Sequence, residues 1–198
     1  IDKYTNINKN GLIATKIREG DSVVAVQLTR AGQEVIVVSA AGKSVRFNSD
    51  DARDMGRGAT GVRAMRLADD DEVVGMEPVD PEREILVISE KGYGKRSKID
   101  DYRVQSRGGK GLTNYHVEKY GDVAAIKVVD LEDDIIIISQ DGIIIRIAAE
   151  SIRVCSRPSK GVTLMKVTGE DKVVTIASAP HEDDSETAEI EDTEENVE

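Results

Sequence analysis

Short apolar runs recur along the chain at intervals of 50 residues. The most regular set reads VIVVS, ILVIS and IIIIS. Each run is followed by a turn that contains an aligned glycine: Gly42, Gly92 or Gly142. A second, less regular apolar stretch follows each turn. A run of β-branched residues, a glycine turn and a second run together predict a β-hairpin.

The remainder of each repeat predicts two more strands. A long polar loop follows the hairpin and closes on an aligned glycine, at Gly61, Gly111 or Gly161. The stretches 62–67 and 162–167 predict a third strand. The apolar runs that begin at Val23, Val73, Val123 and Val173 predict a fourth. Four short strands per 50 residues, repeated without predicted helices, indicate an all-β, propeller-like fold of four-stranded blades.

The period divides the chain into predicted units. We predict the end of a truncated blade at 1–32, blades at 33–82, 83–132 and 133–180, and a disordered acidic tail at 181–198. Because one blade cannot bury both of its faces, neighbouring blades must supply the core. The sequence begins in the middle of the pattern, so we expect it to be part of a longer protein.

The formal net charge of −11 belongs mainly to the tail. Residues 181–198 hold 10 of the 38 acidic residues and no lysine or arginine, so the rest of the chain is close to neutral. Low apolar content and high charge density predict that the tail is disordered. The single cysteine, Cys155, excludes an internal disulfide framework and fits a reducing cytoplasm. The chain has no apolar run of 18 residues, so we predict neither a spanning helix nor a membrane partner.

Arginine recurs in the polar loops, which read MGRGATG (55–61), QSRGGKG (105–111) and CSRPSKG (155–161). The middle loop lies in the most basic window, since residues 91–110 hold seven Lys and Arg against two Asp. Glycine lets backbone N–H groups approach a phosphate, and the arginine fork can bind it with two hydrogen bonds. Such loops at the edge of a disc predict a basic rim that holds double-stranded DNA by its backbone.

The candidate DNA-binding residues fall into three groups. They are the loop cations Arg57, Arg107, Lys110, Arg157 and Lys160; the aligned Arg53, Arg103 and Arg153; and Lys95, Arg96 and Lys98 near the middle loop. A structural role is an equal alternative for the strand arginines Arg46, Arg96 and Arg146, which could pair with an acidic neighbour or cover an apolar face. The same alternative applies to Arg53 and its two aligned copies.

The sequence offers no catalytic residue, metal site or cofactor motif. It has no G-x-x-x-x-G-K-[ST] run, and GGKG in the middle loop lacks that spacing. The two histidines, His116 and His181, have no partners at metal-ligand spacing. Five Tyr, one Phe and no Trp provide little for base stacking, which argues against a reader of single strands.

The loop QSRGGKG within a 50-residue blade resembles the C-terminal domain of the DNA gyrase A subunit, of the type IIA topoisomerase family. The phrases EVIVVSAAGKSVRF, DMGRGATGVRAMRL and SRPSKGVTLMKV are similar to blades of that family, and the likeness covers 1–180. The resemblance implies a six-bladed β-pinwheel whose basic perimeter wraps DNA. In gyrase this wrap supports the ATP-dependent introduction of negative supercoils.

The resemblance also implies partners and a location. These are the gyrase B subunit, which carries the ATP and Mg²⁺ sites, a second A subunit in an A2B2 complex, and the bacterial cytoplasm with its chromosome. The tyrosine that cuts DNA lies in the N-terminal part of the A subunit in this family. We therefore expect that this chain alone neither cuts DNA nor hydrolyses ATP.

One motif departs from the family pattern, whose signature box is QRRGGRG. The corresponding residues here are Gln105, Ser106, Arg107, Gly108, Gly109, Lys110 and Gly111. Ser106 stands in place of an arginine and Lys110 in place of a later one. We interpret this stretch as the degenerate box of a late blade, and we expect the true box upstream of Ile1.

Two other interpretations remain open. The C-terminal domain of the topoisomerase IV A subunit shares the pinwheel, with a weaker box. A protein-interaction propeller is the alternative of a different class, although the period and the lack of Trp argue against WD40-like repeats. For the tail, competition with DNA for the basic rim and a simple contribution to solubility are equal alternatives.

Overall fold

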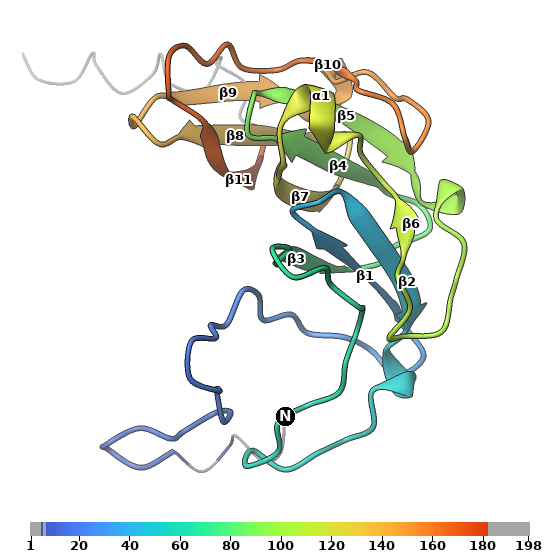
Figure 1. Ribbon diagram of the computed structural model, residues 1–198, viewed down its shortest axis with the longest axis vertical. Coiled ribbons are helices and arrows are strands. Elements are labelled where there is room, and N and C mark those ends of the chain that lie inside the picture. Colours follow the sequence, from blue (N-terminus) through green and yellow to red (C-terminus); the bar gives the residue numbers. More distant parts are fainter. Residues whose placement is uncertain (1–4, 6, 182–198) are drawn as a thin grey trace, which may run out of the picture.

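The computed structural model describes residue 5 and residues 7–181. Three antiparallel sheets stand side by side, and the N-terminal segment runs apart from them as an extended loop (Figure 1). The elements in chain order are β1 (Glu34–Ser39), β2 (Lys43–Asn48), η2 (Ser49–Asp51), β3 (Val73–Pro78), β4 (Glu84–Ser89), β5 (Tyr93–Lys98), η3 (Ile99–Asp101), β6 (Leu112–Thr113), α1 (Val117–Tyr120), β7 (Val123–Val129), β8 (Asp133–Ser139), β9 (Ile144–Ala148), η4 (Ala149–Ser151), β10 (Val162–Thr163) and β11 (Val173–Pro180). The all-β, pinwheel-like fold expected from the repeat is confirmed.

Each full repeat contains the predicted hairpin. β1 pairs with β2, β4 with β5, and β8 with β9, all antiparallel and in the same register. The turn glycines Gly42, Gly92 and Gly142 all have positive φ, between 73° and 85°. This region is open to glycine and costly for other residues, which explains why the turn keeps glycine at one phase. The fourth strand also forms as expected in these repeats, where β3, β7 and β11 pair with the first strand of their own hairpins.

The third strand departs from the expectation. It is only two residues long, and it joins the sheet of the preceding repeat. β6 pairs with β2 through Lys43↔Thr113, and β10 pairs with β5 through Tyr93↔Thr163. The resulting sheet orders are β3-β1-β2-β6, β10-β5-β4-β7 and β11-β8-β9. Successive repeats are therefore linked by strand exchange as well as by packing.

Two predicted strands are absent from the structure. Residues 23–28 form no strand, and the stretch 62–67 contains only a bridge between Met65 and Gly109. The aligned stretches of the later repeats do pair, β3 with β1 and β6 with β2. In 23–28 the large apolar side chains lie in solvent, as in Val26, which is 83% exposed.

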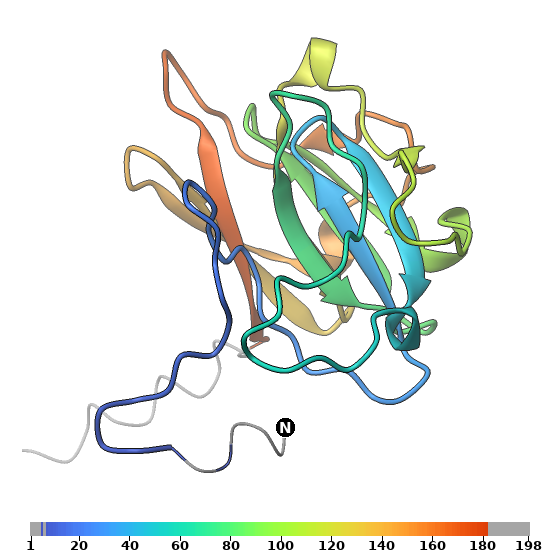
Figure 2. The same ribbon diagram turned by 60° about the horizontal axis from the view of Figure 1, so that its bottom comes forward.

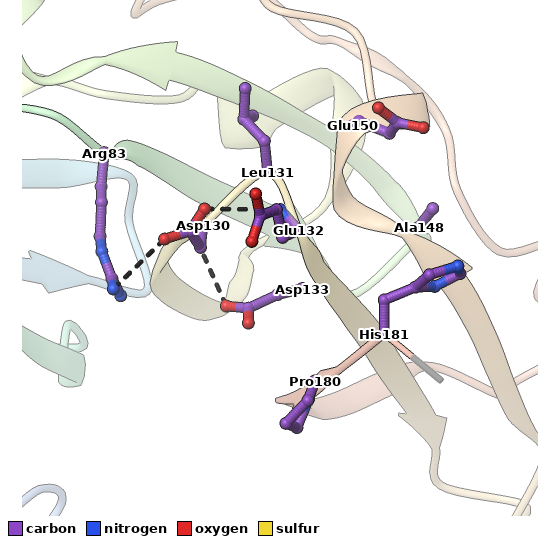
Figure 3. Close-up of a pocket in the computed structure, with 9 residues that line it drawn as sticks. All are labelled: Arg83, Asp130, Leu131, Glu132, Asp133, Ala148, Glu150, Pro180 and His181. Carbon is purple, nitrogen blue, oxygen red and sulfur yellow. Dashed lines mark hydrogen bonds and ion pairs between the residues drawn. The ribbon is translucent and has the colours of Figure 1, made fainter. Parts of the chain in front are cut away.

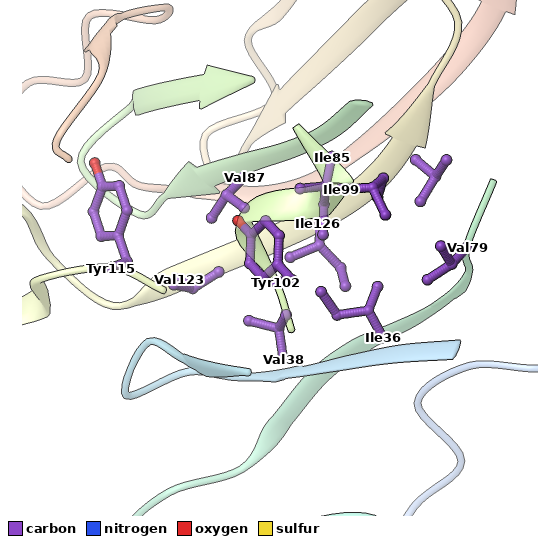
Figure 4. Packing of buried hydrophobic residues seen from close by; sticks show 11 residues of the cluster. Ile36, Val38, Val79, Ile85, Val87, Ile99, Tyr102, Tyr115, Val123 and Ile126 are labelled. Atoms are coloured by element: carbon purple, nitrogen blue, oxygen red, sulfur yellow. The ribbon is translucent and has the colours of Figure 1, made fainter. Parts of the chain in front are cut away.

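The core lies between the sheets. Ile36 and Val38 of β1 face Ile85 and Val87 of β4, with β7 completing the cluster (Figure 4). Alternate residues of β1 face the other way, where Val35 and Val37 pack with Val45, Phe47 and Met65. Because both faces of the inner strands are covered, these strands are continuous apolar runs rather than alternating ones.

Short helical turns occur where none were predicted. Three 3₁₀ turns, η2, η3 and η4, follow the second strand of each hairpin, and α1 is a single helical turn. The turned view shows the three hairpins lying one after another, with the loops at their borders (Figure 2). The predicted disordered tail lies outside the described residues, apart from His181.

Candidate nucleic-acid interface

The arginine-bearing loops lie at the borders between repeats. We call the repeats 33–82, 83–132 and 133–180 the first, second and third unit, and their two borders the first and second junction. At the first junction the amide of Gln105 donates to the carbonyl of Arg46 at 2.7 Å. At the second junction the amide of Cys155 donates to the carbonyl of Arg96 at 2.8 Å. Each loop is thus fixed along the second strand of the unit before it.

The aligned loop arginines bind backbone carbonyls of the preceding repeat. Arg107 donates from Nε to the Asp51 carbonyl at 2.9 Å and from Nη1 to the Arg63 carbonyl at 3.3 Å. Arg157 repeats this arrangement with the carbonyls of Asp101 and Thr113. These two bonds use two of the five N–H donors of a guanidinium, so a phosphate could still be bound by the others. The loop arginines therefore link the units as well as carrying charge.

The first copy keeps part of this pattern. Arg57 donates from Nη1 to the carbonyl of Ile13 at 3.2 Å, which is the same sequence offset of 44 residues as in the other two copies. Sequence reasoning missed this bridging role, because the acceptors are main-chain carbonyls, which have no signature in residue type.

The strand arginines are held by acidic neighbours. Arg46 pairs with Glu34 and Arg96 with Glu84, each at 2.5 Å and each 12 residues away in sequence. Arg96 is 6% exposed, and it also donates to the carbonyls of Ile152 and Glu150 across the second junction. The structural alternative stated for these arginines accounts for their contacts. We therefore leave Arg96 out of the proposed interface.

Two predicted lysines are also engaged inside the fold. Lys95 is 0% exposed, and its ammonium donates to three oxygens. Lys160 is half-buried, with Nζ 4.4 Å from the ring centroid of Tyr93 and 5.3 Å from that of Tyr120. A cation over two aromatic faces is favoured by their electron density. Both ammonium groups are less available to a phosphate than the sequence suggested.

Six of the candidate cations are exposed to solvent: Arg53, Lys98, Arg103, Arg107, Lys110 and Arg153. Four of them, Lys98, Arg103, Arg107 and Lys110, belong to the loop side of the second unit. This unit therefore carries four of the six exposed candidates. We call these four residues the exposed cation group.

The degenerate box, residues 105–111, is tied to the first unit by its own backbone. Gly108 donates its amide to the Ala64 carbonyl at 2.6 Å, and the Arg66 amide donates to the Gly109 carbonyl at 2.8 Å. Gly111 ends the loop with φ of 76°, and a Cβ there would lie 2.7 Å from the Ser44 carbonyl oxygen. The glycines of the box thus serve conformation and close approach, with Gln105 and Gly108 half-buried and Ser106, Gly109 and Lys110 exposed.

A hollow at the end of the third unit has the opposite chemistry. It is lined by Arg83, Asp130, Leu131, Glu132, Asp133, Ala148, Glu150, Pro180 and His181 (Figure 3). Four carboxylates outnumber its two basic side chains, so a phosphate backbone would be repelled there. Nearby, hydrogen bonds from His181 and Arg146 hold the pKa of Asp134 below its usual range.

Within the described residues, no three His, Cys, Asp or Glu side chains gather in a way that could hold a metal ion. In the same part of the chain, none of the helices has the length and apolar content needed to cross a bilayer.

Comparison with known proteins decides the family. The sequence matches the family described as DNA gyrase C-terminal domain, beta-propeller, over residues 1–30, 33–80, 83–130 and 133–180. The chain belongs to the DNA gyrase C-terminal domain family. The matched segments follow the 50-residue period, so the resemblance carried by the loop phrases is confirmed.

Curated relatives of this gyrase-family chain are gyrase A subunits. It is 50% identical to the DNA gyrase A subunit of Klebsiella oxytoca over 62 residues, which are 31% of this chain and 7% of the relative. It is 41% identical to the DNA gyrase A subunit of Clostridium acetobutylicum over 63 residues, 32% of this chain and 8% of the relative. The matched stretch therefore spans less than a tenth of these relatives.

Solved structures support the same fold. A DNA gyrase A C-terminal domain superimposes with a TM-score of 0.78 at 29% identity, over 86% of this chain and 58% of that one. The C-terminal domain of a DNA topoisomerase IV superimposes with a TM-score of 0.85 at 22% identity, over 93% and 58% of the two chains. The second likeness shows the fold alone, whereas gyrase A relatives share both fold and sequence with this chain.

Proposed function

We propose that this chain binds double-stranded DNA through the phosphate backbone and contributes to DNA wrapping by a gyrase A subunit. The observation that carries the proposal is the exposed cation group on the second unit, Lys98, Arg103, Arg107 and Lys110. Arg53 and Arg153 extend it on the neighbouring units. Contacts of this kind neutralise phosphates without reading bases, which suits a surface that must hold any sequence.

The parent complex belongs to the same proposal. We place this chain in a bacterial, chromosome-associated type II topoisomerase, together with the gyrase B protein and a second copy of the A protein. The resemblance to gyrase assigns ATP and Mg²⁺ to the B protein, and this sequence has no phosphate-binding loop motif. DNA cleavage is assigned to another part of the A protein, so that this chain supplies binding and not catalysis.

The test measures the salt dependence of binding to a linear DNA duplex. Six phosphate contacts, from the exposed cation group together with Arg53 and Arg153, should give a slope of log K against log salt of about −5.4. The triple variant Lys98→Gln/Arg103→Gln/Lys110→Gln removes three contacts and keeps the bridging Arg107. We expect its slope to fall to about −2.7, with a large loss of affinity at low salt.

The control removes the same charge elsewhere. Arg83, Lys119 and Lys172 are exposed and lie outside the exposed cation group, so Arg83→Gln/Lys119→Gln/Lys172→Gln is matched in charge. We expect this control to keep nearly the wild-type slope. Equal slopes in the two triple variants, or a flat slope in the wild type, would contradict the proposal.

A further inference from the structure

The strand β5 carries two polar side chains at positions that are apolar in the other units. Lys95 aligns with Val45 of β2 and Ile145 of β9, and Ser97 aligns with Phe47 and Ile147. Lys95 and Ser97 are both 0% exposed. An aliphatic residue fills the position of Lys95 in the other two units, so packing alone does not require a lysine there.

Both side chains donate to the backbone of the neighbouring loop. Ser97 Oγ donates to the carbonyl of Cys155 at 2.8 Å. Lys95 Nζ donates to the carbonyl of Ser156 at 3.2 Å, to the carbonyl of Arg157, and to Ser97 Oγ at 3.2 Å. An ammonium group has three N–H donors, and all three are used. Three consecutive carbonyls of the loop are thus held from one strand.

The ammonium group is costly to keep in this place. Its hydrogen-bond partners are neutral oxygens, and burial lowers the pKa of Lys95 to about 8. The other ionisable groups that face it are Cys155 and Asp101, which raise the pKa of Lys95, and Arg157, which lowers it further. A buried charge that adds no packing advantage indicates a requirement for the contacts it makes.

Those contacts fix Arg157 at both ends. Its carbonyl accepts from Lys95, while its guanidinium donates to the carbonyls of Asp101 and Thr113. Arg153, at the start of the same loop, is exposed, and its carbonyl accepts from the amide of Arg96 at 3.1 Å. The loop that presents these two arginines is therefore held by β5 along most of its length.

We propose that Lys95 and Ser97 are positioning residues, which clamp Cys155–Arg157 so that the third unit presents its loop arginines to DNA in a fixed geometry. This inference rests on the proposed DNA binding. It differs from a phosphate contact, because Lys95 is buried and acts through the loop. We call the two side chains and the three carbonyls the loop clamp.

The loop clamp is tested first without DNA. In Lys95→Met the loop loses its ammonium partner, and we expect the amides of Cys155 and Ser159 to exchange with solvent at least about tenfold faster. The matched control is Ile145→Met, which places the same residue at the aligned position of the third unit. That control should leave exchange at Cys155 and Ser159 unchanged.

The second arm measures DNA binding. We expect Lys95→Met to bind a linear duplex about tenfold more weakly, a difference of roughly 1.4 kcal/mol. Its salt slope should stay at the wild-type value, since no phosphate contact is removed, whereas Lys98→Gln should reduce the slope by about 0.9.

The DNA affinity of the wild type should also fall between pH 7 and 9, as Lys95 loses its proton, while the affinity of Lys95→Met should stay nearly constant.

The outcomes separate the two proposals. If the wild type shows no salt-dependent binding, the proposed DNA binding is contradicted. The exchange rates of the Cys155 and Ser159 amides then still test the loop clamp. If the wild type binds and Lys95→Met keeps its affinity and its loop protection, the loop clamp is overturned. A slope reduced by about 0.9 in Lys95→Met would also overturn it, by showing a direct phosphate contact. Should Lys95→Met fail to fold, Ser97→Ala is the second variant. It removes the hydrogen bond to the Cys155 carbonyl and the one from Lys95, but leaves the two bonds from Lys95 to loop carbonyls, so it must give the same changes in smaller measure.

Discussion

The two junctions share a backbone plan and differ in the side chains that line it. Both have a two-residue exchanged strand, paired at Lys43↔Thr113 in the first junction and at Tyr93↔Thr163 in the second. At the first junction, Val45 and Phe47 pack into an apolar cluster with Met65. At the second, the aligned Lys95 and Ser97 bind loop carbonyls instead.

This difference separates the contacts that both junctions share from the side-chain contacts that only one junction makes. Main-chain pairing and arginine bridges are common to both junctions, so they set how one unit follows another. The side chains that face the loop, Val45 and Phe47 at one junction and Lys95 and Ser97 at the other, can differ while these shared contacts are kept. An apolar junction relies on burial, which is non-directional. A polar junction fixes particular atoms, and for this it must bury groups that prefer water.

The largest difference between the junctions should appear at the strand arginines. Arg96→Ala removes a buried arginine and leaves the half-buried Glu84 without its partner, and we expect a loss of about 3 kcal/mol in the free energy of unfolding. Arg46→Ala should cost less, because the Arg46–Glu34 pair is more exposed to water than the Arg96–Glu84 pair. Urea denaturation of the two variants measures both values.

A third arginine serves as the reference for that series. Arg146 pairs with Asp134 at 2.6 Å, and its side chain is 43% exposed. The side chain of Asp134 is 7% exposed, but His181 also binds it at 2.9 Å, so Asp134 keeps a partner in Arg146→Ala. This second partner and the solvent screening of Arg146 should reduce the effect of Arg146→Ala to about 1 kcal/mol. Equal losses in all three variants would show that burial of the pair does not set its contribution, and would remove this contrast between the junctions.

The closing glycines give the next largest effect. A Cβ on Gly161 would overlap the carbonyl oxygen of Gly94, and one on Gly111 would lie 2.7 Å from that of Ser44. Gly61 has a similar positive φ but no heavy atom within 4 Å of such a Cβ. We expect Gly161→Ala and Gly111→Ala to cost about 2–4 kcal/mol and Gly61→Ala about 1–2, by the same denaturation measurement.

Gly61→Ala isolates the cost of backbone conformation alone, since the aligned residues share that conformation. The excess at Gly111 and Gly161 then reports how closely each exchanged strand approaches its neighbour. If Gly61→Ala were as destabilising as the other two, close approach at the junctions would play no part.

The hairpins could be predicted from sequence because their determinants are local. A β-branched run, a glycine with positive φ and a second run specify each other within a few residues. The exchanged strand could not be assigned in the same way. A repeat shows that Leu112 and Val162 are equivalent, but not whether each pairs within its own unit or with the one before.

The candidate site was predicted in part for a related reason. Residue type and period located the arginines, and the structure leaves Arg103, Arg107 and Lys110 exposed. The bridging role of Arg107 could not be predicted, because its acceptors are main-chain carbonyls. The unusual role of Lys95 could have been found from the sequence, since the aligned positions of the other two repeats hold the apolar residues Val45 and Ile145. A polar residue at a position that is apolar in the other repeats indicates a specific local contact.

The smallest effect concerns the pH dependence of stability at the second junction. Unfolded Lys95 keeps an ordinary pKa near 10.4, whereas burial lowers the folded pKa to about 8. Between these values the unfolded state binds more protons than the folded state, so stability rises with pH. From pH 8 to 9, the free energy of unfolding of the wild type should rise by about 1 kcal/mol relative to that of Lys95→Met.

The control is Val45→Met, at the aligned position of the first junction, whose free energy of unfolding should change with pH as that of the wild type does. Denaturation at both pH values checks this, and a flat or falling difference between wild type and Lys95→Met would mean that the ammonium is not titrated inside the fold.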